Sequence, residues 1–454
     1  MKRIFFAFSI LFLSIPGSAQ REALIKAFKK FENDPQLKAA ISSLYVIDAK
    51  TGKIIFDKNS SIGLAPASTQ KLITGAAAYE LLGRDFRYKT EFGIIKINEE
   101  TNLFIKPSGD PTLGSWRWDS TKEKNVLPRI INAYKKNSSS FSKVFVQDEG
   151  WNYESIPDGW TWQDIGNFYG AGAGILNWRE NQFDIILKSG KNIGDEVKIV
   201  GTEPSLYSYK FFSVATAVKD TNDNSYIYYS LGKNEGIIRG TIPVSRNRFV
   251  ISGAMPDPQK QFVETLLDSL KSLKKTTASS ASVMNNEVVN PTIFHIETSP
   301  PLDSIIYWLN KKSVNLYAEA LLKTISYEKT KIASTEKGLE VIKKFWKSKG
   351  IDTMQLNIQD GSGLSPSNRV TTKAEVQVLQ YAKRQSWFKG YFNSLPEYNR
   401  MKMKSGTIKD AKGFAGYHTS KAGTQYIFSF LVNNYNGSSK ALVQKMYKVL
   451  NELK

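Results

Sequence analysis

The stretch Ala65-Pro66-Ala67-Ser68-Thr69-Gln70-Lys71 sets a serine and a lysine three positions apart, and small apolar residues follow as far as Leu82 before Gly83. Side chains three residues apart on a helix share one face, so we expect the Ser68 hydroxyl and the Lys71 amine to meet. Serine is a poor nucleophile until a base takes its proton, and a lysine can be that base when burial and nearby positive charge lower its pKa. The stretch therefore predicts a helix that presents a nucleophile and its base.

The Ser-x-x-Lys spacing alone is a weak signal, because six more such pairs begin at Ser140, Ser230, Ser272, Ser326, Ser334 and Ser386. Each of those is most simply a surface pair. Ser68 differs in context, since it alone opens an apolar helix behind a proline and a predicted hairpin with strands at 43–48 and 54–57. A helix that starts there has a buried, oriented N-terminus.

Two later motifs carry matching chemistry. Ser313-Val314-Asn315 offers a hydroxyl and an amide on one side of a tight loop entering a helix, although a plain helix N-cap is the structural alternative. Lys404-Ser405-Gly406-Thr407 places a cation and two hydroxyls along a strand, with a glycine that lets a ligand backbone approach closely. We interpret the similar triplets at 50–52 and 188–190 as turns.

The three motifs in this order, with Ser313 following Ser68 by 245 positions, resemble the class C low-molecular-mass penicillin-binding proteins. These form the D-alanyl-D-alanine carboxypeptidase/endopeptidase family. The resemblance extends over most of the chain, through the stretches at 109–113, 299–302, 313–319 and 360–365. It implies the α/β (α+β) penicillin-binding/β-lactamase-like transpeptidase fold, an antiparallel sheet with flanking helices, plus a large β-rich insert.

The predicted organisation has three parts. Residues 1–19 are a signal peptide, 20–93 and 291–454 form the catalytic penicillin-binding domain, and 94–290 form the inserted region. The insert shows short strands and turn clusters rich in Gly, Trp and Tyr, and we expect two nested subdomains in it. More than one domain is expected because single cores stop growing at roughly 250–300 residues.

The resemblance implies a role for each motif residue. Ser68 would be the acylated nucleophile and Lys71 the base that activates it. Ser313 would pass a proton toward the leaving amine, and Asn315 would hold the substrate's amide. Lys404, as a second cation, would keep the Lys71 amine neutral.

The third motif would bind the end of the substrate. Ser405 and Thr407 would hydrogen-bond the terminal carboxylate beside Gly406, and the N–H groups of Ser68 and Thr407 would form the oxyanion hole. Two positions depart from the family pattern: Val314 stands where Asp or Asn is common, and Ser405 where Thr is usual. Since a hydroxyl survives at 405, we expect altered kinetics more than lost function.

Two acidic residues are further candidates. Asp164, in Trp160-Thr161-Trp162-Gln163-Asp164, resembles the family's acidic residue that meets the free amino group of a diamino acid. An aspartate in a surface loop beside packing tryptophans is the alternative. Asp360, between a strand and two glycines, most simply forms a tight turn, although it could shape the rim of the site.

The N-terminus has the form of a secretory signal peptide, with Lys2 and Arg3, an apolar run at 4–15, and small residues at 16–19 before Gln20. A buried core segment is the alternative. We expect cleavage after Ala19 and export to the periplasm or cell envelope. No later apolar run approaches the roughly 20 residues of a membrane span, so we expect at most peripheral membrane association.

The formal charge of +20 falls to +18 without Lys2 and Arg3. Nucleic acid is the usual partner of such an excess, but an exported protein meets little of it, so we expect none. A polyanionic envelope fits better, although scattered lysines could serve solubility alone. Without Cys, the fold must be held by packing rather than disulfides.

Other hydrolytic mechanisms lack their residues. His295 and His418 lie in strand-like apolar surroundings, no Gly-x-Ser-x-Gly is present, and no His and Cys cluster suggests a metal. No cofactor is implied, and the expected ligands are peptidoglycan stem peptides and β-lactams. A β-lactamase of the same fold and a catalytically silent peptidoglycan-binding protein remain alternatives. Carboxypeptidase versus endopeptidase preference, the diamino acid and the oligomeric state stay open.

Overall fold

An antiparallel six-stranded sheet in the order β17-β18-β19-β20-β1-β2 forms the centre of the catalytic body. The computed structural model describes residues 16–97, 99–137, 140–272, 281–284 and 290–454. Strand β1, from the N-terminal part, pairs with β20 from the C-terminal part, so both ends of the chain build this sheet. Its strands are β1 (Ile41–Asp48), β2 (Ile54–Lys58), β17 (Glu397–Tyr398), β18 (Met401–Ile408), β19 (Ala411–Thr419) and β20 (Gln425–Asn433).

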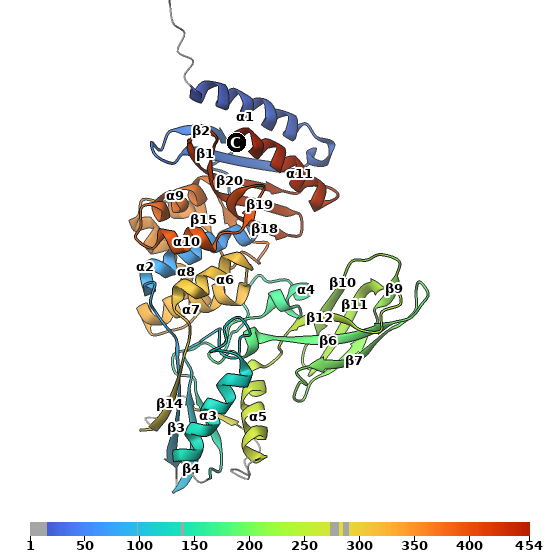
Figure 1. Ribbon diagram of the computed structural model, residues 1–454, viewed down its shortest axis with the longest axis vertical. Coiled ribbons are helices and arrows are strands. Elements are labelled where there is room, and N and C mark those ends of the chain that lie inside the picture. Colours follow the sequence, from blue (N-terminus) through green and yellow to red (C-terminus); the bar gives the residue numbers. More distant parts are fainter. Residues whose placement is uncertain (1–15, 98, 138–139, 273–280, 285–289) are drawn as a thin grey trace, which may run out of the picture.

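Helices cover both faces of this sheet (Figure 1). Because strand side chains alternate, Leu44 and Val46 pack under α1 (Pro16–Glu32) and α11 (Ser439–Leu450), while Tyr45 and Ile47 face the larger helical layer. That layer contains α2 (Lys71–Leu82), α6 (Leu302–Lys311), α7 (Asn315–Thr330), α8 (Thr335–Ser348), α9 (Thr372–Lys383) and α10 (Phe388–Ser394). The predicted antiparallel sheet with flanking helices is therefore confirmed.

A second, five-stranded sheet lies below the body in Figure 1, in the order β13-β5-β4-β3-β14. Its strands are β3 (Lys89–Ile97), β4 (Glu100–Lys106), β5 (Val144–Gln147), β13 (Ala281–Met284) and β14 (Thr292–Thr298), flanked by α3 (Glu123–Asn137) and α5 (Pro258–Lys271). Pairing of β3 with β14 closes the insert, so its strands reach slightly beyond 94–290. The domain boundaries and the nested division stay a prediction.

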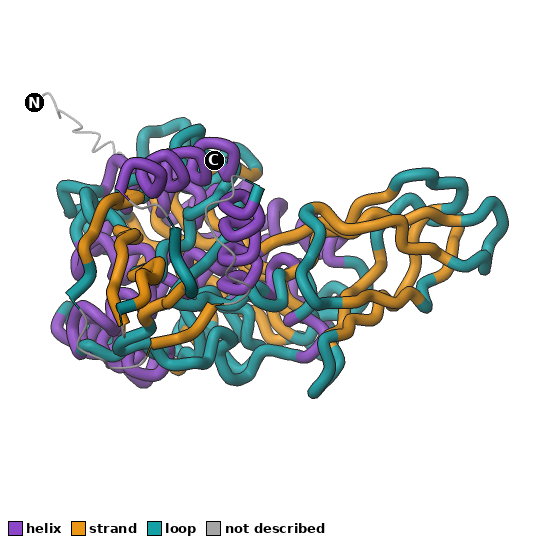
Figure 2. Tube along the Cα trace, turned by 90° about the horizontal axis from the view of Figure 1, so that it is seen from below, coloured by secondary structure: helices purple, strands orange, loops and turns teal. Residues whose placement is uncertain are grey.

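A smaller pair of sheets forms an arm that projects sideways (Figures 1 and 2). One sheet contains β6 (Gln182–Ser189), β7 (Val197–Glu203) and β12 (Phe249–Ala254), and the other β8 (Lys210–Ser213), β9 (Thr216–Val218), β10 (Asn224–Tyr229) and β11 (Glu235–Pro243). A short helix, α4 (Trp162–Ile165), lies against β10 where the arm leaves the body. The remaining short elements are η1 (Pro35–Leu37), η2 (Ala67–Gln70), η3 (Phe168–Gly170), η4 (Arg179–Asn181), η5 (Thr353–Gln355), η6 (Asn451–Leu453), β15 (Leu356–Asn357) and β16 (Arg369–Val370).

The predicted signal peptide at 1–19 falls mostly on residues 1–15, which lie outside the described residues. Helix α1 begins at Pro16, and it buries Leu24, Phe28 and Phe31 against the sheet. Within the part of the chain that the structure describes, no helix has the length and apolar character to cross a membrane.

Candidate active site

Ser68 and Lys71 lie at the junction of η2 and α2, beneath the edge of strand β18. The Lys71 side chain is fully buried, and its Nζ donates to Ser68 Oγ at 2.9 Å, Asn315 Oδ1 at 2.5 Å and the Ser362 carbonyl at 2.7 Å. The predicted helix thus begins as a 3₁₀ turn, and α2 proper starts at Lys71. This turn places the hydroxyl and the amine within hydrogen-bonding distance.

The environment of Lys71 favours a neutral amine. Burial lowers its pKa to about 7, against the opposing pull of the Asp360 and Glu319 carboxylates, which raise it. Of the two causes expected from the sequence, burial is the leading one, and Lys404 is not among the groups that shift the pKa of Lys71. An amine that loses its proton near neutral pH can accept one from serine.

A second pair of amine and hydroxyl completes the site. Lys404, on β18, is buried, and its Nζ donates to Ser313 Oγ at 2.9 Å and to the Ser405 carbonyl at 2.8 Å. Burial, and then the positive charges of Lys71 and Lys412, hold the pKa of Lys404 well below its ordinary value. Across the described ranges, no group of three or more His, Asp or Glu side chains is arranged to hold a metal ion.

Gly406 allows β18 to lie against the turn that carries Ser68. A Cβ at this position would stand 2.4 Å from the Pro66 carbonyl and 3.0 Å from the Ser68 nitrogen. Ser405 is half-buried and Thr407 is exposed, with its Oγ1 accepting from Lys412 Nζ at 2.5 Å. The third motif therefore runs so close to the turn that carries Ser68 that no side chain fits at position 406.

The loop at 360–365 supplies a group that sequence reasoning missed. Asp360 is buried, and its carboxylate accepts from Trp160 Nε1 at 2.9 Å and from the N–H groups of Gly363 and Ser365, each at 2.7 Å. These bonds fix the loop that presents the Ser362 carbonyl to Lys71. Asp360 thus caps its own tight turn and, through that turn, also shapes the loop beside Lys71. A backbone carbonyl has no sequence signal that could have identified Ser362.

The insert reaches the site through Tyr169. Its carbonyl accepts from Asn315 Nδ2 at 2.6 Å, and its phenol lies near the Asp164 carboxylate. Burial and then the Asp164 carboxylate raise the pKa of Tyr169. Asp164 is half-buried in α4 and also accepts from Thr161 Oγ1 at 2.7 Å. The predicted Asp164 therefore lies close to Tyr169, whose carbonyl contacts the cluster around Lys71.

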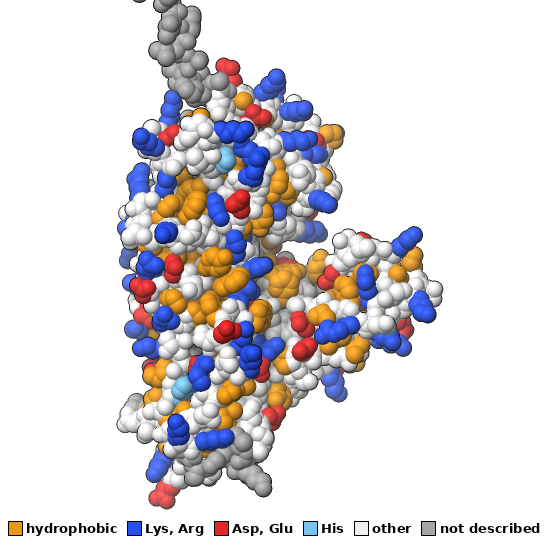
Figure 3. All heavy atoms as spheres, viewed as in Figure 1, with side chains coloured by type: hydrophobic (Ala, Val, Ile, Leu, Met, Phe, Trp, Pro, Cys, Tyr) orange, Lys and Arg blue, Asp and Glu red, His pale blue; other side chains and the backbone are white. Residues whose placement is uncertain are grey.

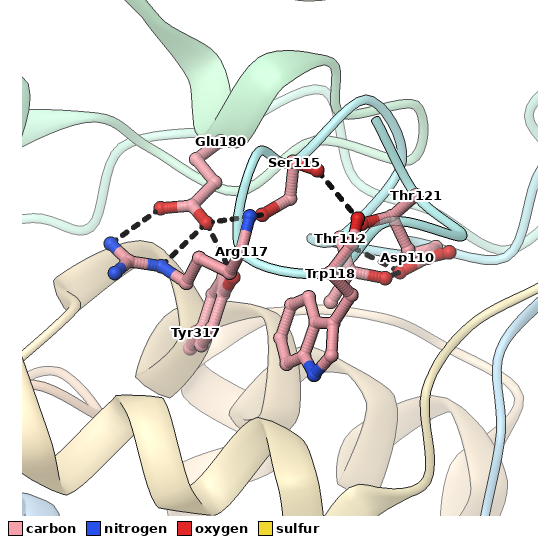
Figure 4. Close-up of polar contacts among 8 residues, drawn as sticks. All are labelled: Asp110, Thr112, Ser115, Arg117, Trp118, Thr121, Glu180 and Tyr317. Carbon is pink, nitrogen blue, oxygen red and sulfur yellow. Dashed lines mark hydrogen bonds and ion pairs between the residues drawn. The ribbon is translucent and has the colours of Figure 1, made fainter. Parts of the chain in front are cut away.

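A buried ion pair of the insert, Arg117 with Glu180, is hydrogen-bonded to Tyr317 on α7 (Figure 4). Glu180 is fully buried and accepts from Ser115 Oγ at 2.6 Å, from Arg117 Nε at 2.7 Å and Nη2 at 2.9 Å, and from Tyr317 Oη at 2.6 Å. Tyr317 lies on α7 two residues after Asn315. We call these four residues the Glu180 joint; sequence reasoning missed it because its members are far apart in the chain.

Comparisons with known proteins agree with this geometry. The profile of the D-Ala-D-Ala carboxypeptidase 3 (S13) family matches residues 24–453. The chain is 24% identical over 445 residues to the D-alanyl-D-alanine carboxypeptidase of Actinomadura sp. (strain R39), covering 90% of this chain and 81% of the relative. It is 25% identical over 419 residues to D-alanyl-D-alanine carboxypeptidase DacB of Haemophilus influenzae, covering 85% and 83%.

Solved structures show the same fold. Penicillin binding protein 4 (dacB) from Haemophilus influenzae superposes with a TM-score of 0.78 at 20% identity, covering 96% of this chain and 98% of that chain. The same protein complexed with a β-lactam gives a TM-score of 0.73 at 20% identity, with 95% and 99% covered. The predicted penicillin-binding fold is confirmed.

Proposed function

The chain belongs to the D-Ala-D-Ala carboxypeptidase 3 (S13) family, and from this premise we propose that it is a serine D,D-peptidase of peptidoglycan stem peptides. The predicted resemblance to class C penicillin-binding proteins is confirmed by that membership. One observation carries the proposal. A fully buried lysine amine, with its pKa lowered to about 7, lies 2.9 Å from a half-buried serine hydroxyl.

Ser68 Oγ attacks the carbonyl carbon of the penultimate D-alanine, and its proton passes to Lys71 Nζ. As the C–N bond breaks, the leaving nitrogen takes a proton through Ser313 Oγ, for which the 2.9 Å contact with Lys404 gives support. Water then hydrolyses the Ser68 ester and restores the hydroxyl. Asn315 has two roles in this scheme. Its Oδ1 accepts from Lys71 Nζ, and its side chain would also contact the substrate amide.

The carboxylate end of the substrate would lie along β18. Ser405 and Thr407 hold the terminal carboxylate, and the N–H groups of Ser68 and Thr407 stabilise the oxyanion, at about 3 kcal/mol per donor. The close approach of Gly406 to the Ser68 nitrogen supports this arrangement.

Asp164 is our proposed contact for the free amino group of the diamino acid in the stem. Its support is its closeness to Tyr169, whose carbonyl contacts Asn315. The signal-peptide pattern at 1–19 supports export to the periplasm or cell envelope. β-Lactams are proposed as acylating ligands, because they bind the related penicillin binding protein 4.

The test is release of D-alanine from a pentapeptide stem ending in D-Ala-D-Ala, followed for the wild type, S68A and S386A. Ser386 is an exposed serine with the same Ser-x-x-Lys spacing and serves as the matched control. We expect loss of release in S68A alone. Equal release by S68A and the wild type would overturn the proposal, and rapid turnover of penicillin without peptide cleavage would indicate a β-lactamase.

A further inference from the structure

An exposed aromatic surface carries a cation where the arm leaves the body. We call Trp162, Tyr228 and Arg239 the Arg239 shelf. Trp162 is 47% exposed, and its Nε1 donates to the Tyr229 carbonyl at 2.8 Å, which fixes the indole. The Trp162 and Tyr228 ring centroids are 5.2 Å apart, with 69° between the rings. The Trp162 ring is therefore tied to β10 although it faces solvent.

Arg239 is held over both rings. The centre of its guanidinium lies 4.7 Å from the Tyr228 ring and 5.6 Å from the Trp162 ring. Among residues with described positions, no carboxylate lies within ion-pair distance of Arg239. A guanidinium stacked on aromatic faces keeps its N–H groups free at the edge, in the planar fork that suits a carboxylate. The shelf thus presents an oriented cation without a partner.

The shelf adjoins the proposed substrate site. Tyr169 contacts Asn315 through its carbonyl, and its phenol lies near both the Asp164 carboxylate and Tyr228. Trp162 precedes Asp164 by two residues on α4. In Figure 3, hydrophobic side chains gather in the notch between body and arm, where Figure 1 draws α4. A ligand extending outward from Ser68 past Asp164 would reach this surface.

We propose that Arg239 binds a carboxylate of the stem peptide, on the residue that precedes the diamino acid. This inference rests on the proposed function. Each residue of an extended peptide advances the chain by roughly 3.3–3.6 Å, so the residue before the diamino acid lies one step beyond Asp164. Asp164 and Arg239 then match the stem's amino group and carboxylate with opposite charges.

The test compares two stem peptides that differ in one group: a free carboxylate on the residue before the diamino acid, or the same carboxylate amidated. We expect the wild type to favour the free carboxylate by about tenfold in kcat/KM, mostly through KM, since hydrogen bonds between charged groups are worth this much. R239Q should lose that preference and R239K should keep part of it. R246Q, an exposed arginine elsewhere on the arm, should keep it in full.

The outcomes separate the two proposals. If the wild type cleaves both peptides equally, or if R239Q keeps the preference, Arg239 does not bind the carboxylate while the peptidase assignment stands. If the wild type releases D-alanine from neither peptide, the proposed function fails, and the shelf proposal fails with it.

Discussion

The Lys71 amine is surrounded by three oxygen atoms, from Ser68, Asn315 and Ser362. An ammonium group can donate to all three, because it has three N–H bonds. The neutral amine can instead accept the Ser68 proton and donate to the other two. Both protonation states therefore fit one side-chain position, and the proton moves without a change of rotamer. A base must also lose its proton near neutral pH, and burial meets this requirement by lowering the pKa of Lys71 to about 7.

The pH dependence of acylation tests this directly. Because the Lys71 pKa is lowered to about 7, the ammonium form predominates below that pH and cannot take the serine proton. The second-order acylation rate constant should rise about tenfold per pH unit below about 7 and level off above it. K71R should be inactive across the range, since a guanidinium keeps its proton. A rate constant that stays flat from about pH 5 to 9 would contradict Lys71 as the base.

At the scale of secondary-structure elements, Glu375 connects α9, η2 and β20 next to Ser68. It lies on α9, and its two carboxyl oxygens are each 2.5 Å from a hydroxyl, those of Thr69 in η2 and Ser429 in β20. Thr69 Oγ1 also lies 2.7 Å from the Pro66 carbonyl oxygen, and the hydroxyl has a single proton to donate. If Thr69 donates there, Glu375 must donate to Thr69. Burial, which raises the pKa of Glu375 to about 7, favours this protonated form.

Stability should therefore depend on pH through Glu375. Its folded-state pKa lies above the ordinary 4.5, so the protonated Glu375 makes its full contribution to the free energy of unfolding below about pH 4.5. This contribution is lost as the pH rises through about 7. The loss amounts to about 3 kcal/mol at high pH. E375Q should remove this part of the pH dependence, as measured by urea unfolding at about pH 5 and 9. An unchanged difference between the two pH values in E375Q would show that other groups cause it.

Local motifs were predictable at this scale because their chemistry lies within a few residues. Ser68 and Lys71 are three positions apart, and Ser313 and Asn315 flank one residue at the start of α7. Gly406 was expected to permit a close approach, and its neighbour proves to be the protein's own Pro66 carbonyl. The Ser362 carbonyl escaped prediction since every residue has a backbone carbonyl and only the folded loop selects one.

At the scale of the whole molecule, the insert and the body meet along α7. Three side chains of this helix reach into the insert. Asn315 donates to the Tyr169 carbonyl, and Tyr317 donates to Glu180. Lys323 donates to the carbonyls of Glu154 and Ala173. Glu180 also has a positive φ of 53°, a conformation that non-glycine residues seldom adopt. The insert is thus fixed to the helix that carries the second motif.

Y317F should weaken the Glu180 joint and disturb the site together. Removing one hydrogen bond to a buried carboxylate costs about 1–3 kcal/mol, and the freed start of α7 should lower kcat for the stem peptide several-fold. Y88F is the matched control, because the Tyr88 hydroxyl also contacts α7, at Thr324, far from Asn315. Equal losses of kcat in the two variants would mean that the joint serves stability alone.

Long-range contacts of this kind set the limit of prediction. The sequence indicated a β-rich insert from its turns and aromatic residues, but not which strands pair or that Arg117 and Glu180 meet 63 residues apart. The pairing of β3 with β14 likewise joins segments about 200 positions apart. Such contacts depend on the complete topology, whereas the motif residues can be recognised from a few neighbouring positions in the sequence.

The central claim is that Ser68 is the nucleophile of an acyl-enzyme. The most direct measurement is peptide mapping by mass spectrometry after brief exposure of the protein to benzylpenicillin, with S68A and S386A alongside. We predict one long-lived adduct, with the whole antibiotic added, on the peptide that contains Ser68 in the wild type and S386A, and none in S68A. An adduct on another serine, or none at all with the antibiotic left intact, would contradict the claim.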